Sequence, residues 1–155
     1  MNLNTDFQDY LLLLNKYDVQ YLLVGGMAVN MYGYRRSTGD MDLFINPTAE
    51  NHEKLKKVHS EFGMHMGEME RLENFLNTDT YDVYTFGVSP IQIDIMTKCK
   101  GLDFEGAFSN RDQLTISRGL VISIVDLHDL MSAKQASGRH RDLADIEELK
   151  KIHKI

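Results

Sequence analysis

The chain has 155 residues, with 17 Lys and Arg against 23 Asp and Glu, a net charge of −6, and 43% hydrophobic residues. These proportions are those of a folded globular protein and exclude global disorder, and the length suits one domain with its own core. A protein that grips long nucleic acid through its phosphates normally carries a basic footprint. Because the balance here is acidic, no extended nucleic-acid surface is expected.

Cysteine and histidine content argues against a zinc site. Cys99 is the single cysteine, which excludes an intrachain disulfide and a zinc site built on cysteines. The six histidines show no metal-ligand spacing, and we predict that they lie at the surface.

The sequence also bears on location. Its first residues lack the basic start and long apolar run of a signal peptide. No segment has the roughly 20 apolar residues that span a bilayer, and a lone cysteine suits a reducing compartment. We therefore expect a soluble cytoplasmic protein without a membrane partner.

Apolar periodicity and turn residues predict an alternation of helices and strands. Helices are predicted at residues 6–17, 27–34, 49–62, 127–137 and 141–152, and strands at residues 19–24, 41–45, 81–86, 91–96, 114–117 and 120–124. Thr48 and Asp126 are predicted helix caps, residues 63–77 are predicted to be partly helical, and hairpins join the last two pairs of strands. This order predicts an α/β (α+β) fold, a mixed sheet flanked by helices. We expect a single domain over residues 1–155, with a core at about 19–125 and two C-terminal helices within about 126–155.

Three acids fall on predicted strands. Asp40 and Asp42 are two residues apart, so a strand sends both carboxylates to one face, where they repel each other. Asp94 interrupts the apolar strand 91–96, and if the two strands are neighbours the three carboxylates converge. Oxygen ligands of this kind suit Mg²⁺, and three acids can hold two ions for in-line displacement at phosphorus. The alternative is that Asp40 is a turn residue and Asp42 a solvated strand-edge residue.

Gly25 and Gly26 end a predicted strand just before a helix. Glycines there let the backbone approach a ligand closely, and the N-terminus of a helix attracts phosphate. A tight turn is the alternative interpretation. The surrounding sequence matches neither a Walker loop nor a dinucleotide-binding fingerprint.

In this order the motifs resemble the DNA polymerase beta-like nucleotidyltransferase superfamily, and they are most similar to its small bacterial AbiEii-type or uncharacterised branch. The matching pieces are Val24-Gly25-Gly26, Arg36-Ser37-Thr38-Gly39-Asp40-Met41-Asp42-Leu43, Ile93-Asp94-Ile95, and a C-terminal helix with Lys134 followed by an Arg- and Asp-rich turn at 138–146. The resemblance spans roughly residues 19–149.

The resemblance implies a role for each matching residue. It makes Asp40, Asp42 and Asp94 the catalytic residues and the ligands of Mg²⁺ or Mn²⁺. Nucleotide binding falls to Gly25, Gly26, Arg36, Thr38 and Lys134. Arg36 and Thr38 would orient the acidic strand or touch the nucleotide, and Lys134 would reach the phosphates unless it is an ordinary solvated lysine.

The implied reaction moves a nucleoside monophosphate from a nucleoside triphosphate, with ATP the first candidate, to an acceptor hydroxyl and releases pyrophosphate. The acceptor could be a protein, as in toxin–antitoxin pairs, an RNA end or a small molecule. A homodimer or a partner protein is expected to complete the acceptor site. The alternative is a non-catalytic nucleotidyltransferase-like binding module that acts through a partner protein.

Overall fold

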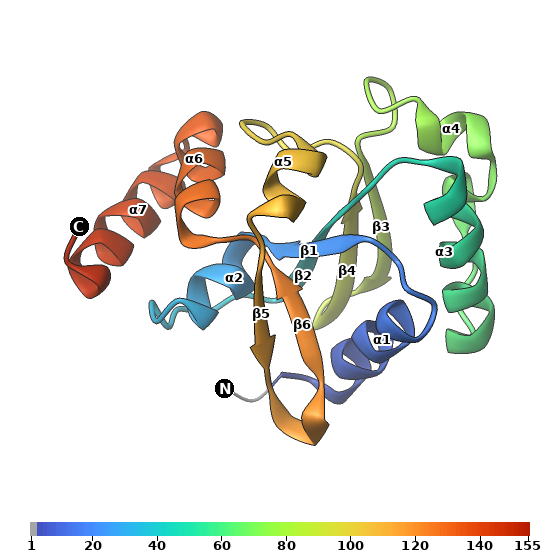
Figure 1. Cartoon of the computed structure of the whole chain (residues 1–155), viewed down its shortest axis with the longest axis horizontal. Helices are drawn as coiled ribbons and strands as arrows, with labels where there is room; N and C mark the ends of the chain where they lie inside the picture. Colours follow the sequence, from blue (N-terminus) through green and yellow to red (C-terminus); the bar gives the residue numbers. More distant parts are fainter. Residues whose placement is uncertain (1–2) are drawn as a thin grey trace.

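The computed structural model describes residues 3–155, apart from the side chain of Arg118. These residues form one mixed six-stranded sheet and seven α-helices (Figure 1). The strands are β1 (Tyr21–Val24), β2 (Asp40–Ile45), β3 (Val83–Val88), β4 (Ile91–Met96), β5 (Asp112–Thr115) and β6 (Val121–Ile124). The helices are α1 (Thr5–Lys16), α2 (Gly25–Met31), α3 (Ala49–Phe62), α4 (Leu72–Leu76), α5 (Phe104–Ser109), α6 (Leu127–Ser137) and α7 (His140–His153), with short 3-10 turns at Gly67–Glu70 and Ser117–Gly119.

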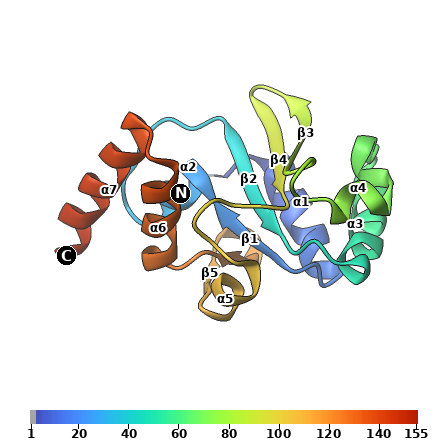
Figure 2. The same cartoon turned by 90° about the horizontal axis from the view of Figure 1, so that it is seen from above.

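The strand order is β3-β4-β2-β1-β6-β5. β2 runs parallel to β4 and β1 runs parallel to β6, whereas β1–β2, β3–β4 and β5–β6 are antiparallel pairs. The predicted mixed sheet, its flanking helices and the two hairpins are thus confirmed. Viewed from above, α1, α3 and α4 lie toward one end of the molecule, and α6 and α7 lie at the other, with β2 between them (Figure 2).

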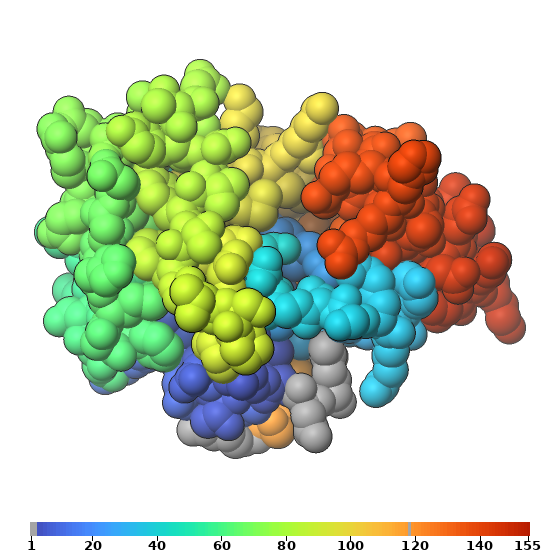
Figure 3. Space-filling view, turned by 180° about the vertical axis from the view of Figure 1, so that it is seen from behind, coloured from blue at the N-terminus to red at the C-terminus, as the bar shows by residue number. Residues whose placement is uncertain are grey.

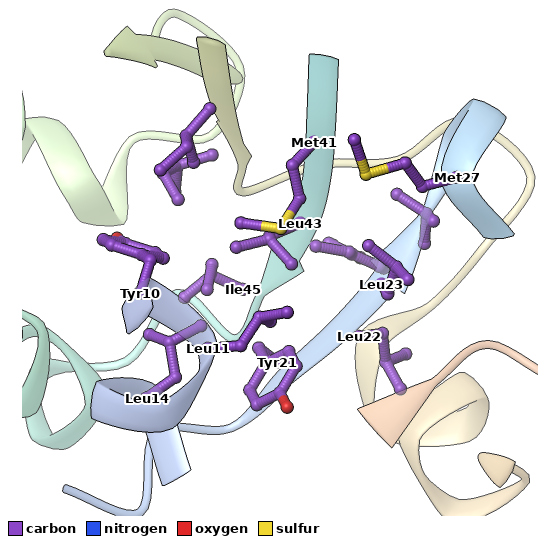
Figure 4. Packing of buried hydrophobic residues seen from close by; sticks show 14 of the residues in the cluster. Tyr10, Leu11, Leu14, Tyr21, Leu22, Leu23, Met27, Met41, Leu43 and Ile45 are labelled. Carbon is purple, nitrogen blue, oxygen red and sulfur yellow. The ribbon is translucent and has the colours of Figure 1, made fainter. Parts of the chain in front are cut away.

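One face of the sheet is a continuous apolar layer. Alternate residues of β2 and β4, such as Met41, Leu43 and Ile95, are fully buried on this face. They belong to one core cluster with apolar residues of α1, among them Leu11 and Leu14 (Figure 4). Burying a side chain of this size contributes about 1.5–3 kcal/mol, so this layer holds the central strands in place.

The other face of the sheet is covered only in part by α5. Phe104 of α5 packs edge-on against Phe44 of β2, with 5.1 Å between the ring centroids. Phe44 and Asp42 share a face because they are two residues apart on one strand. On this face, the first half of β2 therefore carries the acids, and the second half is apolar and covered by α5.

Sequence and structure differ at a few elements. The helix predicted at 27–34 begins at Gly25 itself and ends at Met31. Helix α5 was not predicted, although Asp103 caps it by accepting a hydrogen bond of 3.1 Å from the Gly106 N–H. The caps at Thr48 and Asp126 are confirmed, with hydrogen bonds of 3.2 and 2.7 Å. None of the helices within residues 3–155 has the length and apolar content needed to cross a membrane.

The prediction of surface histidines is wrong for His52 and His59, which are buried. His59 belongs to α3, and its ring contacts both α1 and the chain after α3. Its Nε2 is 2.7 Å from the Tyr10 hydroxyl, and its Nδ1 is 3.1 Å from the His65 carbonyl oxygen. Since a carbonyl only accepts, Nδ1 carries the proton and Nε2 accepts from Tyr10. Burial lowers the pKa of His59, which favours the neutral ring in the folded protein.

We expect Tyr10→Phe to lower the free energy of unfolding by about 1–3 kcal/mol, because it leaves the buried Nε2 of His59 without a donor. Urea unfolding at pH 8 measures the change. Tyr81→Phe is the matched control, since Tyr81 is only half-buried and its ring stacks on Tyr84. Equal losses for the two variants would contradict the interpretation of His59.

Candidate functional site

The pairing of β2 and β4 brings Asp42 and Asp94 together, and β3 adds a polar side chain beside them. β2 and β4 are neighbours, which was the condition for convergence, and in their parallel register Asp42 lies opposite Asp94 and Asp40 opposite Gln92. On the far side of β4, Thr85 of β3 lies opposite Asp94. Neighbouring strands are about 4.8 Å apart, so the polar side chains of these strands form two short rows on one face of the sheet.

Asp42 is held in an unfavourable electrostatic position. Burial raises the pKa of Asp42 to about 7, and the charges of Asp94 and Asp40 and a hydrogen bond to Asp94 act in the same direction. The charge of Lys134 opposes the shift without cancelling it. A carboxyl group whose pKa is raised by burial and by like-charged neighbours costs the folded protein stability when it ionises. Groups of this kind are common at functional sites.

Asp40 and Asp94 share one donor. The Gln92 side-chain nitrogen lies 3.3 Å from Asp40 Oδ2 and 3.2 Å from Asp94 Oδ1. The hydroxyl of Thr85 also donates to Asp94 Oδ1, at 2.9 Å. Sequence reasoning assigned no role to Thr85 or Gln92. The alternation of the strand placed Gln92 on the same face as Asp94, but the contact of Thr85 depends on the register of the β3–β4 hairpin.

Gly25 permits a close approach between α2 and the acids. Its φ of +70° favours glycine, and a Cβ built there would lie 2.1 Å from Asp42 Oδ2. At Gly26 a Cβ would lie 2.6 Å from Thr38 Oγ1. Both glycines are therefore required by packing in this structure, Gly25 against the Asp42 carboxylate and Gly26 against the loop that precedes β2.

Lys134 is buried, with 7% of its surface exposed, and the interpretation as a solvated lysine is wrong. Its ammonium lies 3.1 Å from Asp142 Oδ1 and 3.1 Å from Asp145 Oδ2, two carboxylates that α7 buries completely or nearly so. Arg139 binds Asp142 from the start of α7, at 2.8 Å. Burial alone would raise the pKa of Asp142, but hydrogen bonds from Arg139 and Lys134 hold it well below its usual range.

Arg36 and Thr38 lie behind Gly26. The Nε and one terminal nitrogen of Arg36 each lie 2.8 Å from an oxygen of Asp145, a two-point contact that also ties the loop before β2 to α7. This arrangement places Arg36 in structural support of the acidic strand. We call Arg36, Lys134, Arg139, Asp142 and Asp145 the ion cluster; the two aspartates in it emerge only from the folding of α7 onto α6.

A cavity of about 170 Å³ lies beside Gly25 and Asp42, between the sheet and α6. Its apolar wall includes Val24, Met96, Leu102 and Leu130, and its polar lining includes Lys100, Lys134, Ser137, Arg139 and Asp142. Figure 3 shows this side of the molecule, where the surface around residue 40 lies between the β3–β4 hairpin and α6–α7. The cavity thus joins Asp42 of β2 to basic side chains of α6, the start of α7 and the loop after β4.

A larger cavity, about 640 Å³, opens on the opposite side of the sheet between α1, the end of α3 and the β3–β4 hairpin. Its lining is mostly apolar, and Glu61 at its rim accepts hydrogen bonds from Lys16 and Tyr17. Convergent polar groups and a perturbed pKa identify a functional site better than volume does. By both criteria, the smaller cavity beside Asp42 is the candidate site.

The acids fit a hard cation in part. Within residues 3–155, no three His, Cys, Asp or Glu side chains come close enough together to form a metal site by themselves. Asp42 and Asp94 do meet, and Asp40 is one hydrogen-bond donor away from Asp94. Mg²⁺ needs only one or two protein carboxylates, because it keeps water and phosphate oxygens as its other ligands. The donor set therefore suits an ion that completes its coordination with substrate.

We expect Gly25→Ala to lower the free energy of unfolding by about 1–3 kcal/mol, because the new Cβ meets the Asp42 carboxylate and the positive φ is strained. Gly39→Ala is the control: a Cβ there meets no atom within 4 Å. Urea unfolding compares the two variants. Equal stability of both would mean that Gly25 has more room than the packing against Asp42 allows.

Asp145→Ala should cost roughly 3 kcal/mol at neutral pH, since it leaves Arg36 and Lys134 without their shared buried carboxylate. Hydrogen bonds from Arg36 and Lys134 lower the pKa of Asp145 against the effect of burial. Its contribution is therefore complete above pH 3.8, the ordinary aspartate value, and fades as the pH falls further. The surface ion pair between Glu148 and Lys151 provides the control. Glu148→Ala should change the free energy of unfolding by no more than about 0.5 kcal/mol. A loss that did not shrink in acid would contradict the ion-cluster explanation.

Comparison with known protein families assigns the chain to a family. No curated protein matches this chain. A family model described as "Nucleotidyltransferase of unknown function (DUF6036)" matches residues 2–155, so that the ordered strands, the glycines and the ion cluster all fall within it. The chain therefore belongs to this family of nucleotidyltransferases of unknown function.

Proposed function

We propose that this protein is a metal-dependent nucleotidyltransferase that transfers a nucleoside monophosphate from a nucleoside triphosphate, with ATP the first candidate, to an acceptor hydroxyl. The observation that carries the proposal is the opposition of Asp42 and Asp94 across neighbouring strands, beside Gly25 and the buried Lys134. The family match supports the general class of reaction. The AbiEii-type resemblance, a toxin–antitoxin role, a homodimer or partner protein and a cytoplasmic location belong to the proposal as predictions.

Asp42 and Asp94, whose side chains meet, would hold Mg²⁺ or Mn²⁺, with Asp40 as the third predicted ligand. When bound, the metal ion offsets the charge of the carboxylates and of the triphosphate and polarises the reacting phosphoryl group. The raised pKa of Asp42 supports this assignment, because a bound cation would offset both the burial of this carboxylate and the repulsion from Asp94 and Asp40.

The nucleotide lies in the cavity between the sheet and α6. Gly25 and Gly26 present backbone without a side chain, and this lets phosphate oxygens approach closely. Lys134 and the exposed Arg139 supply positive charge at the cavity wall. Arg36 and Thr38 hold the loop before β2 in place, which keeps Asp40 and Asp42 aligned.

Asp94 takes the proton of the acceptor hydroxyl as the hydroxyl oxygen attacks the α-phosphorus. A new phosphorus–oxygen bond forms, the bond from the α-phosphorus to the bridging oxygen breaks, and pyrophosphate leaves with that oxygen. Catalysis comes chiefly from holding the reactants in line and from charge compensation. A protein hydroxyl, an RNA end and a small molecule are all acceptors with the required chemistry.

The test is Asp42→Asn, studied by calorimetric titration of ATP with and without Mg²⁺. We expect Mg²⁺-dependent binding in wild type and its loss in the variant, with Asp82→Asn, at an exposed acid before β3, behaving as wild type. Equal weak binding in wild type and Asp42→Asn would favour the alternative, a non-catalytic binding module that acts through a partner protein.

The same variant makes a stability prediction without metal. Because the pKa of Asp42 is raised to about 7, ionising it destabilises the folded state progressively from pH 4 to pH 7. Asp42→Asn should therefore be the more stable protein at pH 8, by about 1–2 kcal/mol after solvent screening, and the gain should vanish near pH 4. Chemical unfolding at both pH values measures it, and a variant less stable than wild type at pH 8 would contradict the proposed repulsion.

A further inference from the structure

We propose that Thr85 and Gln92 are positioning residues that orient the Asp94 carboxylate, so that Oδ2 is the oxygen offered to the metal ion and to the acceptor hydroxyl. The inference rests on the proposed function, in which Asp94 is a metal ligand and the proton acceptor. Neither residue belongs to the motifs that the resemblance supplied.

Thr85 is the outer support of Asp94. It lies on β3, the edge strand, directly opposite Asp94 in the antiparallel register. Its hydroxyl donates to Asp94 Oδ1 over 2.9 Å. A threonine side chain has few rotamers on a strand, so the donor is already directed when the hairpin forms. Thr85 is exposed to solvent, and its packing contributes little to the core.

Gln92, two residues before Asp94 on β4, is its second support. Its amide nitrogen is 3.2 Å from Asp94 Oδ1 and 3.5 Å from Oδ2, so the stronger contact is again to Oδ1. The same nitrogen lies 3.3 Å from Asp40 Oδ2. One amide therefore connects the acid of β4 to the first acid of β2.

The combined effect is an asymmetric carboxylate. Oδ1 of Asp94 has two donors, at 2.9 and 3.2 Å, whereas the contact between Oδ2 and Gln92 is longer, at 3.5 Å. Repulsion from Asp42, directly opposite on β2, would turn an unsupported Asp94 side chain away from the site. The two donors oppose that rotation and engage Oδ1. The hydrogen bond that Asp94 shares with Asp42 is the contact that the metal ion would replace. Partners of this kind typically account for 10–100-fold in metal affinity, because they fix the direction of the ligand.

The experiment is a titration of Mn²⁺ into the full chain, with free Mn²⁺ measured by electron paramagnetic resonance. We expect Thr85→Val, which keeps the shape of the side chain and removes the donor, to weaken Mn²⁺ binding about tenfold or more. Thr85→Ser, which restores the hydroxyl, should stay within about threefold of wild type. Gln92→Leu should weaken binding in the same direction as Thr85→Val.

Thr115→Val is the matched control, because Thr115 is an exposed strand residue on β5, the opposite edge of the sheet. It should bind Mn²⁺ as wild type does. Equal melting temperatures for all Thr variants without metal would show that the fold is unchanged.

The outcomes separate the two proposals. Wild type that binds Mn²⁺, with binding lost in Asp42→Asn but unchanged in Thr85→Val or in Gln92→Leu, overturns the positioning role of that residue and leaves the proposed function standing. Loss in Thr85→Val that Thr85→Ser does not restore also overturns it, since the hydroxyl is then not the cause. Wild type that takes up no Mn²⁺, with or without ATP, overturns the proposed function and the inference together.

Discussion

The parallel pairing of β2 and β4 is the constraint on which the site depends. It sets Asp42 directly opposite Asp94, so that burial and two like-charged neighbours raise the pKa of Asp42 to about 7. The pairing itself is held by the other face of the same strands, where Met41, Leu43 and Ile95 are buried under α1 and α3. Apolar burial on one face thus keeps together, on the other, carboxylates that would separate if they were free.

The ion cluster performs the corresponding task for the helical side of the cavity. Asp145 receives two hydrogen bonds from Arg36, in the loop before β2, and one contact from Lys134 of α6. This connects the acidic strand, α6 and α7 through buried charges, and a misplaced helix would leave one of those charges unpaired. Lys134 therefore reaches the cavity in a fixed position, although α6 lies far from β2 in the sequence.

The second face of the sheet has an apolar half and an acidic half. The half of the second face that α5 covers is apolar, with Phe104 against Phe44. The half that carries Asp40, Asp42 and Asp94 is polar, and at Asp42 it borders a cavity whose lining includes basic side chains. Thr85 and Gln92 lie in this acidic half, and both donate hydrogen bonds to Asp94. Acidic and basic side chains thus lie close together. A metal ion would need the acidic ones, and a triphosphate would need the basic ones.

Local sequence signals determined much of the fold. Alternation on the strand put Asp40 and Asp42 on one face, Thr48 and Asp126 marked helix starts, and Gly25-Gly26 marked the end of β1. These features depend on neighbours along the chain, and period and capping chemistry are sufficient to predict them. Helix α5 also has such a signal, the cap at Asp103. The helix was not predicted because its six residues are too few to show a helical period.

Tertiary structure alone decided the rest. The order of strands placed Asp94 beside Asp42, the hairpin register gave Asp94 the hydroxyl of Thr85, and the docking of α7 buried Lys134 between two aspartates. His59 is internal for the same reason, because a partner 49 positions away, Tyr10, makes its burial tolerable. Whether a polar side chain is solvated or buried depends on groups that are distant in the sequence. The spacing of residues along the chain does not show which of these distant groups meet in the folded protein.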